Sequence, residues 1–350
     1  MKADLDLDIG RKTFGSGLLP ELIAVLRRSR PGDLVAVVGD AVGKEQSIGP
    51  GLETWCRFTG NPLLEATVEK GRARWVFRCG VVDVPPGVPA EDKRPVGSRL
   101  WLYTNFDCNL RCDYCCVRSS PTAHRRELGL GRVRRITREA AELGVKEIFV
   151  TGGEPFLLED IGEILLCCAA AAPTTVLTNG MLFTGRRAES LRALPRDRII
   201  LQISLDSATP DLHDLHRGPG AWERTREGIQ RARAQGFRVR LAATVSTDAE
   251  AEEFRQFLDD EKIAAENRII RRIALRGAAS EGVAVGRADL VPEITITAEG
   301  VYWHPVGAED DDLLVTHDIF PLSESFAAVR RAFDREGEQA KKLARIFNCA

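Results

Sequence analysis

The sequence predicts an α/β protein whose main part is an open, partial (β/α)6 barrel. Three observations support this. Strand-like and helix-like runs alternate across residues 98–280, which is typical of a parallel sheet with right-handed crossovers. Only six strand–helix units are present, whereas a closed barrel of this type has eight. A stretch rich in proline and mixed charge at residues 81–97 reads as a linker, and the pattern before it differs.

Residues 1–80 are predicted to form a two-layer α+β domain. The stretch "ADLDLDI" alternates like a strand, and "LLPELIAVLRRS" has the spacing of a helix. A second strand is expected at "LVAVVGD" and a second helix at "GLETWCRFTG", stopping at Gly60. The last part should be a hairpin that turns at Lys70 and Gly71. The expected order is therefore strand, helix, strand, helix, strand, strand.

Residues 98–280 should contain six strands joined by helices. The expected strands are "RLWLYTNF", "KEIFVTGG", "TTVLTN", "RIILQISLD", "RVRLAATVS" and "NRIIRRIALR". The expected helices are "LGRVRRITREAAELG", "DIGEILLCCAAA", "RAESLRAL", "AWERTREGIQRARAQG" and "AEAEEFRQFLDD". Residues 281–350 should form a small C-terminal cap with a strand pair, "EITITAEGVYWHP", and a final helix.

Composition excludes several classes of protein. The chain has 350 residues, a net charge of −2, 44% hydrophobic residues and 29% charged residues, as an ordinary globular protein does. Its first residues are charged rather than apolar, and no apolar run is long enough to span a bilayer. We therefore expect a cytoplasmic protein with no membrane partner, and the near-zero charge does not favour nucleic acid. Nine cysteines without an export signal indicate reduced thiols rather than disulfides.

The most informative stretch is "CNLRCDYCCVRSS", residues 108–120. Cys108, Cys112 and Cys115 have the spacing C-x3-C-x2-C and follow the first predicted strand of the barrel, where α/β folds place their chemistry. Three nearby thiolates repel one another unless a cation or cluster neutralises them. A zinc or disulfide loop is one alternative, and an iron–sulfur cluster with one open iron is the other. Cys116 lies outside this spacing and is expected to be a neighbour rather than a ligand.

This pattern resembles the signature of the radical S-adenosylmethionine (radical SAM) superfamily, C-x3-C-x-aromatic-C, with Tyr114 at the aromatic position. The resemblance covers roughly residues 98–278. It implies one [4Fe–4S] cluster on Cys108, Cys112 and Cys115, with SAM bound at the open iron. It also implies reductive cleavage of SAM to a 5′-deoxyadenosyl radical that abstracts hydrogen from a substrate. The implied partner is an electron donor of the flavodoxin or ferredoxin type.

Two further turns resemble the family. Gly152, Gly153, Glu154 and Pro155 end the second barrel strand and resemble its GGEP segment, which holds the SAM amino group. The glycines are expected to let the backbone approach a ligand closely. Asn179, in "LTNG" after the third strand, is a weaker candidate that reads equally well as a turn or cap residue.

The fourth strand and the segment after it supply the remaining candidates. Ser204 and Asp206 lie on one side by strand alternation and resemble a family S-x-D position with polar contacts to SAM. Arg217, in a predicted loop, resembles an arginine near the SAM carboxylate, although a charged loop residue is more often solvated. His213 and His216 are expected more often to cap or pack than to touch a ligand.

The flanking regions resemble two other families. Residues 3–80 resemble the TusA/SirA-like sulfur-carrier fold, but "FGSGLLPE" stands where that family has its working cysteine. Such a domain cannot carry sulfur in the usual way, and we expect it to dock a partner or cover the active site; Cys56 is expected to be packed. The tail resembles a degenerate SPASM/twitch-like cap in which Trp303, His304 and Pro305 replace cluster cysteines. Only Cys349 follows, so no auxiliary cluster is expected.

A group of arginines follows the cysteine loop. It fits a solvated helix face best, with a nucleic-acid face or a docking site for an acidic electron donor as alternatives. The group comprises Arg118, Arg125, Arg126, Arg132, Arg134, Arg135 and Arg138.

The function predicted from these features is radical SAM catalysis on an unidentified substrate, as peptide modification or as maturation of a cofactor or small molecule. A radical SAM enzyme linked to sulfur metabolism is an alternative. A catalytically silent iron–sulfur scaffold is another, although a scaffold needs no SAM pocket. A zinc protein that binds RNA is the third.

Overall fold

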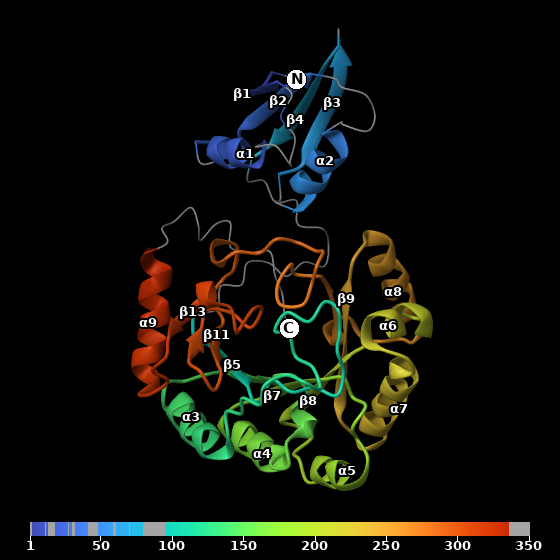
Figure 1. Cartoon of the computed structure of the whole chain (residues 1–350), viewed down its shortest axis with the longest axis vertical. Coiled ribbons are helices and arrows are strands. Elements are labelled where there is room, and N and C mark those ends of the chain that lie inside the picture. The colour runs from blue at the N-terminus through green and yellow to red at the C-terminus, as the bar shows by residue number, and fades with distance from the viewer. Residues whose placement is uncertain are drawn as a thin grey trace. The chain divides into compact units, whose positions relative to one another are not determined.

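The computed structural model describes residues 2–10, 12, 18–26, 28–29, 32–40, 48–58, 61–69, 71–79 and 95–335. The chain divides into two compact units, Met1–Lys93 and Arg94–Ala350 (Figure 1). Most of the predicted linker, residues 81–94, lies outside the described residues, as do the predicted helix stop at Gly60 and the turn residue Lys70.

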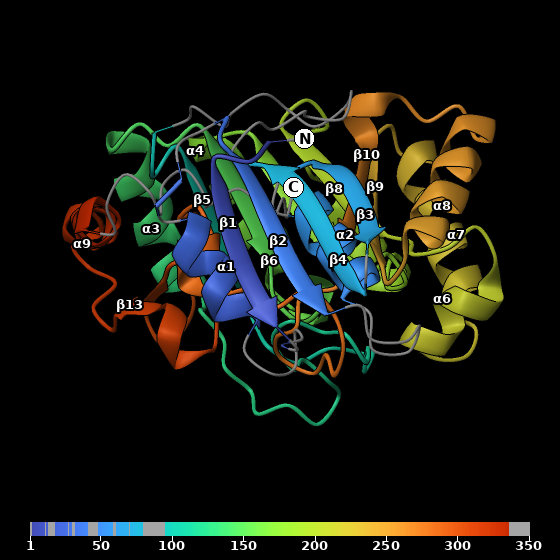
Figure 2. The same ribbon diagram turned by 90° about the horizontal axis from the view of Figure 1, so that it is seen from above.

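The first unit has the element order that the sequence predicts. Its elements are β1 (Leu5–Gly10), α1 (Leu18–Leu26), β2 (Leu34–Asp40), α2 (Gly49–Phe58), β3 (Leu63–Glu69) and β4 (Arg72–Arg78). The sheet order is β1-β2-β4-β3, with β1 parallel to β2 and the other pairs antiparallel. Both helices lie on one face of the sheet (Figures 1 and 2). Val35 and Val37 of β2 are fully buried and share one core cluster with Leu22 of α1 and Leu52 of α2.

The second unit contains the strand–helix series and the cap. Its strands are β5 (Arg99–Tyr103), β6 (Glu147–Thr151), β7 (Thr174–Thr178), β8 (Ile199–Ser204), β9 (Arg238–Val245), β10 (Arg268–Arg272), β11 (Ile294–Ile296), β12 (Val301–Tyr302) and β13 (Leu314–Thr316). Its α-helices are α3 (Leu130–Glu142), α4 (Ile161–Ala171), α5 (Gly185–Arg192), α6 (Pro210–Arg217), α7 (Ala221–Ala234), α8 (Asp248–Asp260) and α9 (Leu322–Arg335).

Six parallel strands form the core of this unit, as predicted. The sheet order is β10-β9-β8-β7-β6-β5-β11-β12-β13, and every neighbouring pair from β10 to β5 is parallel. The strand β11 adds parallel to β5, and β12 and β13 follow antiparallel. The sheet is open because β10 and β13 are its two edges. It is curved, with the helices around its outside (Figure 1).

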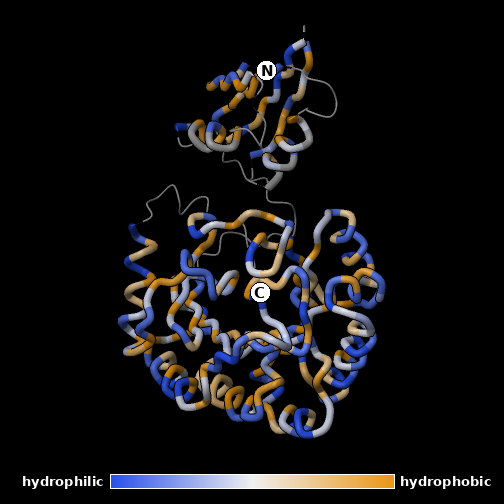
Figure 3. The backbone as a smooth tube through the Cα atoms, in the orientation of Figure 1, coloured by the Kyte–Doolittle hydropathy of each residue, from blue (hydrophilic) through white to orange (hydrophobic). Residues whose placement is uncertain are grey.

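The helices cover the sheet with apolar stripes. The helix α3 buries Val133, Ile136 and Ala140 at helical spacing, and its arginines lie on the opposite, exposed side. Hydrophilic residues accordingly concentrate on the outer helices (Figure 3). Because adjacent strands are parallel, the turns that follow β5, β6, β7 and β8 meet at the carboxyl end of the strands. The predicted site residues lie at this end of the sheet.

Two features differ from the sequence prediction. Residues 210–217, expected as a loop, form the helix α6, which has Pro210 at its first turn and Thr209 as N-cap. A third cap strand, β13, was not predicted. The final helix is confirmed up to Arg335, and Cys349 lies outside the described residues. No helix in the described part of the chain is long and apolar enough to cross a membrane.

Candidate functional site

The three spaced cysteines lie in the loop that follows β5. Cys108 is buried, Cys112 and Cys115 are half-buried, and all three are free thiols. The loop is held in a compact turn, because the backbone N–H of Cys115 donates to the carbonyl of Cys112 at 3.3 Å. The N–H of Leu110 donates to the sulfur of Cys108 at 3.4 Å. Such N–H donors are typical of a site that stabilises thiolate sulfur.

The chemistry of these thiols fits an iron–sulfur cluster. Burial raises the pKa of Cys108 well above its usual range and raises the pKa of Cys112 to about 11. They therefore stay protonated at neutral pH unless a bound cation ionises them. Among the described residues, no three His, Cys, Asp or Glu side chains gather closely enough for a single metal ion. Cysteine thiolates are the ligands that iron–sulfur clusters use.

The double glycine after β6 approaches the backbone that leads into the cysteine loop. A Cβ on Gly152 would lie 2.4 Å from the carbonyl oxygen of Asn105, and one on Gly153 would lie 2.0 Å from that of Asp107. The N–H groups of Gly153 and Glu154 donate to these same carbonyls, each at 3.0 Å. The sequence suggested close approach to a ligand. The close neighbour that the structure gives these glycines is the loop itself.

Glu154 links the ends of β6 and β7. Its side chain is fully buried and accepts from Phe156 N–H at 3.0 Å, from the Thr178 hydroxyl at 2.8 Å and from Asn179 N–H at 2.8 Å. Burial raises the pKa of Glu154, although these three donors oppose the rise. Pro155 follows as the first residue of a short 3-10 turn, Pro155–Leu157. This carboxyl group therefore fixes the turn beside the cysteine loop.

Asn179 connects the turn after β7 to the cysteine loop. Its side-chain oxygen accepts from Met181 N–H at 3.0 Å, which is the turn role that the sequence allows. Its side-chain nitrogen donates to the side chain of Asn109, inside the cysteine loop, at 2.8 Å. Asn179 therefore stabilises the turn after β7 and contacts the cysteine loop as well.

Asp206 lies at the centre of a buried polar cluster. Its carboxylate accepts from Arg217 Nε at 2.5 Å, from Thr244 N–H at 3.0 Å and from the Tyr114 hydroxyl. Burial alone would raise the pKa of Asp206, but the Arg217 guanidinium more than offsets this and holds it below its usual value. Because Tyr114 belongs to the cysteine loop, Asp206 ties that loop to β9 and α6. Ser204 ends β8 and is half-buried.

Residues of α6 hold the loop from the other side. Arg217 is buried, so the expectation of a solvated loop residue is wrong. The Nδ1 atom of His216 lies 2.9 Å from the Asp113 carboxylate. The His216 and Tyr114 rings meet edge to face, with their centroids 5.6 Å apart. His213 is fully buried, and its Nδ1 accepts from the N–H of Asp206 at 3.2 Å. Burial lowers the pKa of His213 to about 4, so it is neutral at physiological pH.

The cap contacts the end of β5, and the segment just before the cap contacts the cysteine loop. The Tyr103 hydroxyl donates to the carbonyl of Pro305 at 2.7 Å, and Ala278 N–H donates to the carbonyl of Cys115 at 2.7 Å. Trp303 is fully buried, and its indole N–H donates to the carbonyl of Leu290 at 2.8 Å. His304 is also buried and accepts from Val306 N–H at 3.1 Å; burial lowers the pKa of His304 to about 3. This histidine is packed and neutral.

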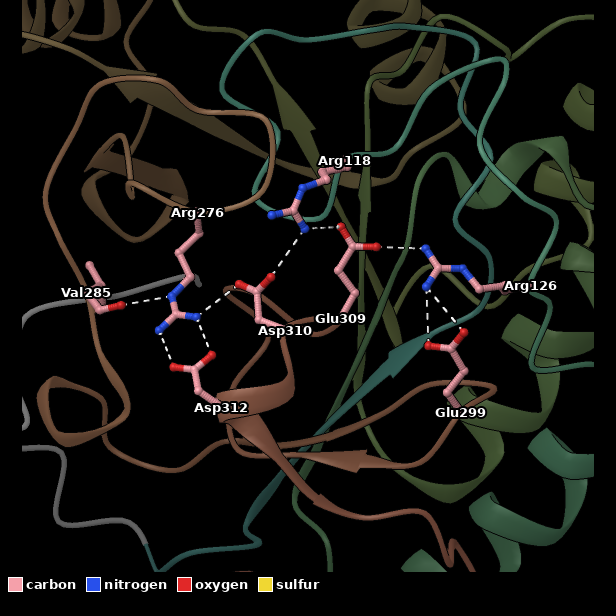
Figure 4. A network of polar contacts seen from close by, with 8 residues as sticks. All are labelled: Arg118, Arg126, Arg276, Val285, Glu299, Glu309, Asp310 and Asp312. Atoms are coloured by element: carbon pink, nitrogen blue, oxygen red, sulfur yellow. Dashed lines mark hydrogen bonds and ion pairs between the residues drawn. The ribbon is translucent and has the colours of Figure 1, made fainter.

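A chain of ion pairs joins the cap to the loop (Figure 4). Arg118, just after the cysteines, pairs with Glu309 and Asp310 at 3.1 and 3.3 Å. Asp310 also pairs with Arg276 at 2.9 Å. Glu309 also pairs with Arg126, at 2.8 Å.

The network extends beyond these residues at both ends. Arg276 donates twice to Asp312, each time at 2.7 Å, and Arg126 pairs with Glu299 at 3.2 Å. Arg118 and Arg126 therefore pair with cap carboxylates, and the Arg118 side chain remains 57% exposed. These carboxylates are ion-pair partners of the loop arginines that sequence reasoning missed. The acidic run at 309–312, after the predicted strand pair, was the signal that could have found them.

Comparison with known proteins identifies part of the chain. A family model described as "Radical SAM superfamily" matches residues 102–260. The "AdoMet-dependent heme synthase" of Methanosarcina barkeri (strain Fusaro / DSM 804) is 37% identical over 141 residues, covering 40% of each chain. The "Antilisterial bacteriocin subtilosin biosynthesis protein AlbA" of Bacillus subtilis (strain 168) is 37% identical over 155 residues, covering 41% of this chain and 33% of that protein. The chain thus spans less than half the length of these relatives.

A solved structure shares the fold. "Native anSMEcpe with bound AdoMet and Kp18Cys peptide" matches with a TM-score of 0.52 and 10% identity, covering 67% of this chain and 82% of that one. At this identity the likeness concerns fold alone. Radical SAM proteins use a [4Fe–4S] cluster and SAM, which agrees with the cysteine set described above. We conclude that residues 102–260 of this chain form a radical SAM domain.

Proposed function

We propose that the chain is a radical SAM enzyme in which Cys108, Cys112 and Cys115 hold one [4Fe–4S] cluster. The chemistry that a bound cluster would supply is the reductive cleavage of SAM, which yields a 5′-deoxyadenosyl radical for hydrogen abstraction. One observation carries the proposal. The cysteine loop is hydrogen-bonded directly to the turns after β6, β7 and β8, through Gly153 to Asn105, Asn179 to Asn109 and Asp206 to Tyr114.

The proposed SAM-binding residues lie in these turns, in the cysteine loop and at the end of α6. They are Tyr114, Gly152, Gly153, Glu154, Pro155, Asn179, Ser204, Asp206 and Arg217. The Glu154 and Asp206 carboxylates each accept hydrogen bonds from three protein groups. These two carboxylates therefore hold the turns and the cysteine loop in place, which keeps the site rigid before SAM binds.

The substrate is a peptide, or a cofactor or small molecule under maturation. This choice is supported by the printed roles of the relatives, one a heme synthase and the other a bacteriocin biosynthesis protein. A reducing donor of the flavodoxin or ferredoxin type supplies the electron. The cap, residues 281–350, is a degenerate SPASM/twitch-like element without an auxiliary cluster, since sequence positions 303–305 read Trp-His-Pro.

Residues 1–80 are proposed to be a TusA/SirA-like domain that docks a partner. The element order and the mixed sheet of the first unit support this assignment. The domain lacks the sulfur-carrier cysteine, and burial raises the pKa of Cys56 to about 12, so this thiol is inert. A role in sulfur metabolism therefore ranks second.

The decisive experiment is anaerobic incubation of the reconstituted protein with SAM and dithionite. The proposal predicts 5′-deoxyadenosine and methionine, and it predicts neither from a variant with all three cysteines changed to alanine. Intact SAM with a fully loaded cluster would support the silent scaffold and contradict the proposal. Transfer of deuterium from labelled candidate substrates into 5′-deoxyadenosine would then identify the substrate class.

A further inference from the structure

The cysteine loop has an apolar side that the motifs do not explain. Cys108 packs in a small cluster with Leu110, Met181 and Ala221, and Cys112 packs against this cluster. The exposed fractions are 7% for Leu110, 9% for Met181 and 0% for Ala221. We call Leu110, Met181 and Ala221 the apolar wall. It is separate from the main core of the second unit, to which none of its residues belongs.

Met181 is held in this place by the turn after β7. Its N–H donates to Asn179, whose side chain also binds Asn109 of the cysteine loop. Gly180 adopts a positive φ of 74°, and a Cβ on Gly228 of α7 would lie 1.9 Å from its carbonyl oxygen. The helix α7 therefore packs directly on the backbone of this turn, next to Met181.

Ala221 is fixed with equal precision. It is the first residue of α7, and the Asp214 carboxylate caps the residues on either side of it. Gly220 N–H donates to Asp214 at 2.6 Å, and Trp222 N–H donates at 2.8 Å. The small side chain of Ala221 is fully buried at the point where this helix meets the loop.

The loop thus has a polar side and an apolar side. Tyr114, Asp206 and Arg217 make the polar side, and the apolar wall makes the other. Reduction adds negative charge to a cluster, and the potential of an iron–sulfur centre depends on solvent exposure and on hydrogen bonds to its sulfurs. The side chains of the apolar wall carry no hydrogen-bond donor, although the backbone N–H of Leu110 donates to the Cys108 sulfur at 3.4 Å. Apolar side chains against a cluster disfavour the added charge and lower that potential.

We infer that Met181, together with Leu110 and Ala221, is a positioning residue that keeps the cluster of this chain at a low reduction potential. The inference rests on the proposed function, because it takes Cys108 and Cys112 as cluster ligands. It assigns a role to Met181 that lies outside the GGEP, TNG and S-x-D motifs. A low potential matters because electron transfer to SAM must be driven by the reduced cluster.

The test is a redox titration of the reconstituted protein, followed by electron paramagnetic resonance of the reduced cluster. Met181→Gln keeps the length of the side chain but adds polar groups. Its midpoint potential should rise so that reduction by a given donor is about tenfold more favourable, which is about 59 mV for one electron. The matched control Met181→Leu keeps an apolar side chain and should change this equilibrium by less than about threefold.

A second polar variant and the iron and sulfide content of each protein complete the test. Ala221→Ser places a hydroxyl in the wall without a large change in volume, and its potential should also rise. Unchanged potentials in both polar variants, at full iron and sulfide content, would overturn the role of the wall but leave the proposed function intact. A wild-type protein that takes up no iron and sulfide would overturn both.

Discussion

Replacing Gly153 by alanine tests the contact between the GGEP turn and the cysteine loop. The added Cβ would lie 2.0 Å from the oxygen and 2.5 Å from the carbon of the Asp107 carbonyl. Both atoms belong to the backbone, so no flexible side chain can move aside. Overpacking costs about 1–3 kcal/mol, and loss of a nearby backbone hydrogen bond adds about 0.5–1.5 kcal/mol. We expect a total loss of about 2–4 kcal/mol.

The measurement is the melting temperature of the second unit, followed anaerobically together with iron content. For a domain of this size the loss corresponds to a fall of about 4 to 16 °C. The matched control is Gly131→Ala in α3, where a Cβ meets nothing within 4 Å. That variant should be neutral or slightly more stable, because alanine favours a helix. A Gly153→Ala protein that melts with the wild type would refute the steric reasoning.

Three other perturbations test the site in the same way. Asp206→Asn leaves the buried Arg217 without its carboxylate and should cost about 3–5 kcal/mol in a thermal melt, whereas Asp113→Asn, on an exposed carboxylate, should cost less than about 1 kcal/mol. Between pH 7 and pH 5 His213 and His304 become protonated in the unfolded chain but stay neutral in the folded one. The free energy of unfolding should therefore fall by about 2 kcal/mol for each histidine. Equal stability at the two pH values would contradict their burial as neutral groups. Arg276→Gln should cost about 2–4 kcal/mol and speed proteolysis within residues 299–312, while Arg255→Gln, which breaks an exposed i,i+3 pair, should change neither measurably.

The strands and the cysteine loop could be predicted because their signals are local. Apolar runs such as those of β6 and β8 have the length and flanking turns of buried strands, and the spacing of Cys108, Cys112 and Cys115 is itself a motif. The turn residues that follow these strands were predicted for the same reason. A parallel sheet brings such turns together at the carboxyl ends of its strands, wherever the turns lie in the sequence.

What could not be predicted depends on contacts between distant residues. Arg118 and Glu309 are 191 positions apart, and nothing local in either segment identifies the other as a partner. The helix α6 was missed because it is short and because its residues are mostly polar. The glycines at 152 and 153 could be singled out from the sequence, but only the fold shows that their close neighbour is a backbone carbonyl.

The central claim is that three thiols of one loop hold the cluster, and metal analysis tests it most directly. Wild-type protein reconstituted without oxygen should contain about four iron and four sulfide per chain, and Cys116→Ala should retain them. Changing Cys108, Cys112 and Cys115 together to alanine should abolish both, while α-helix content stays the same. Equal iron and sulfide in that triple variant and in the wild type would contradict the account.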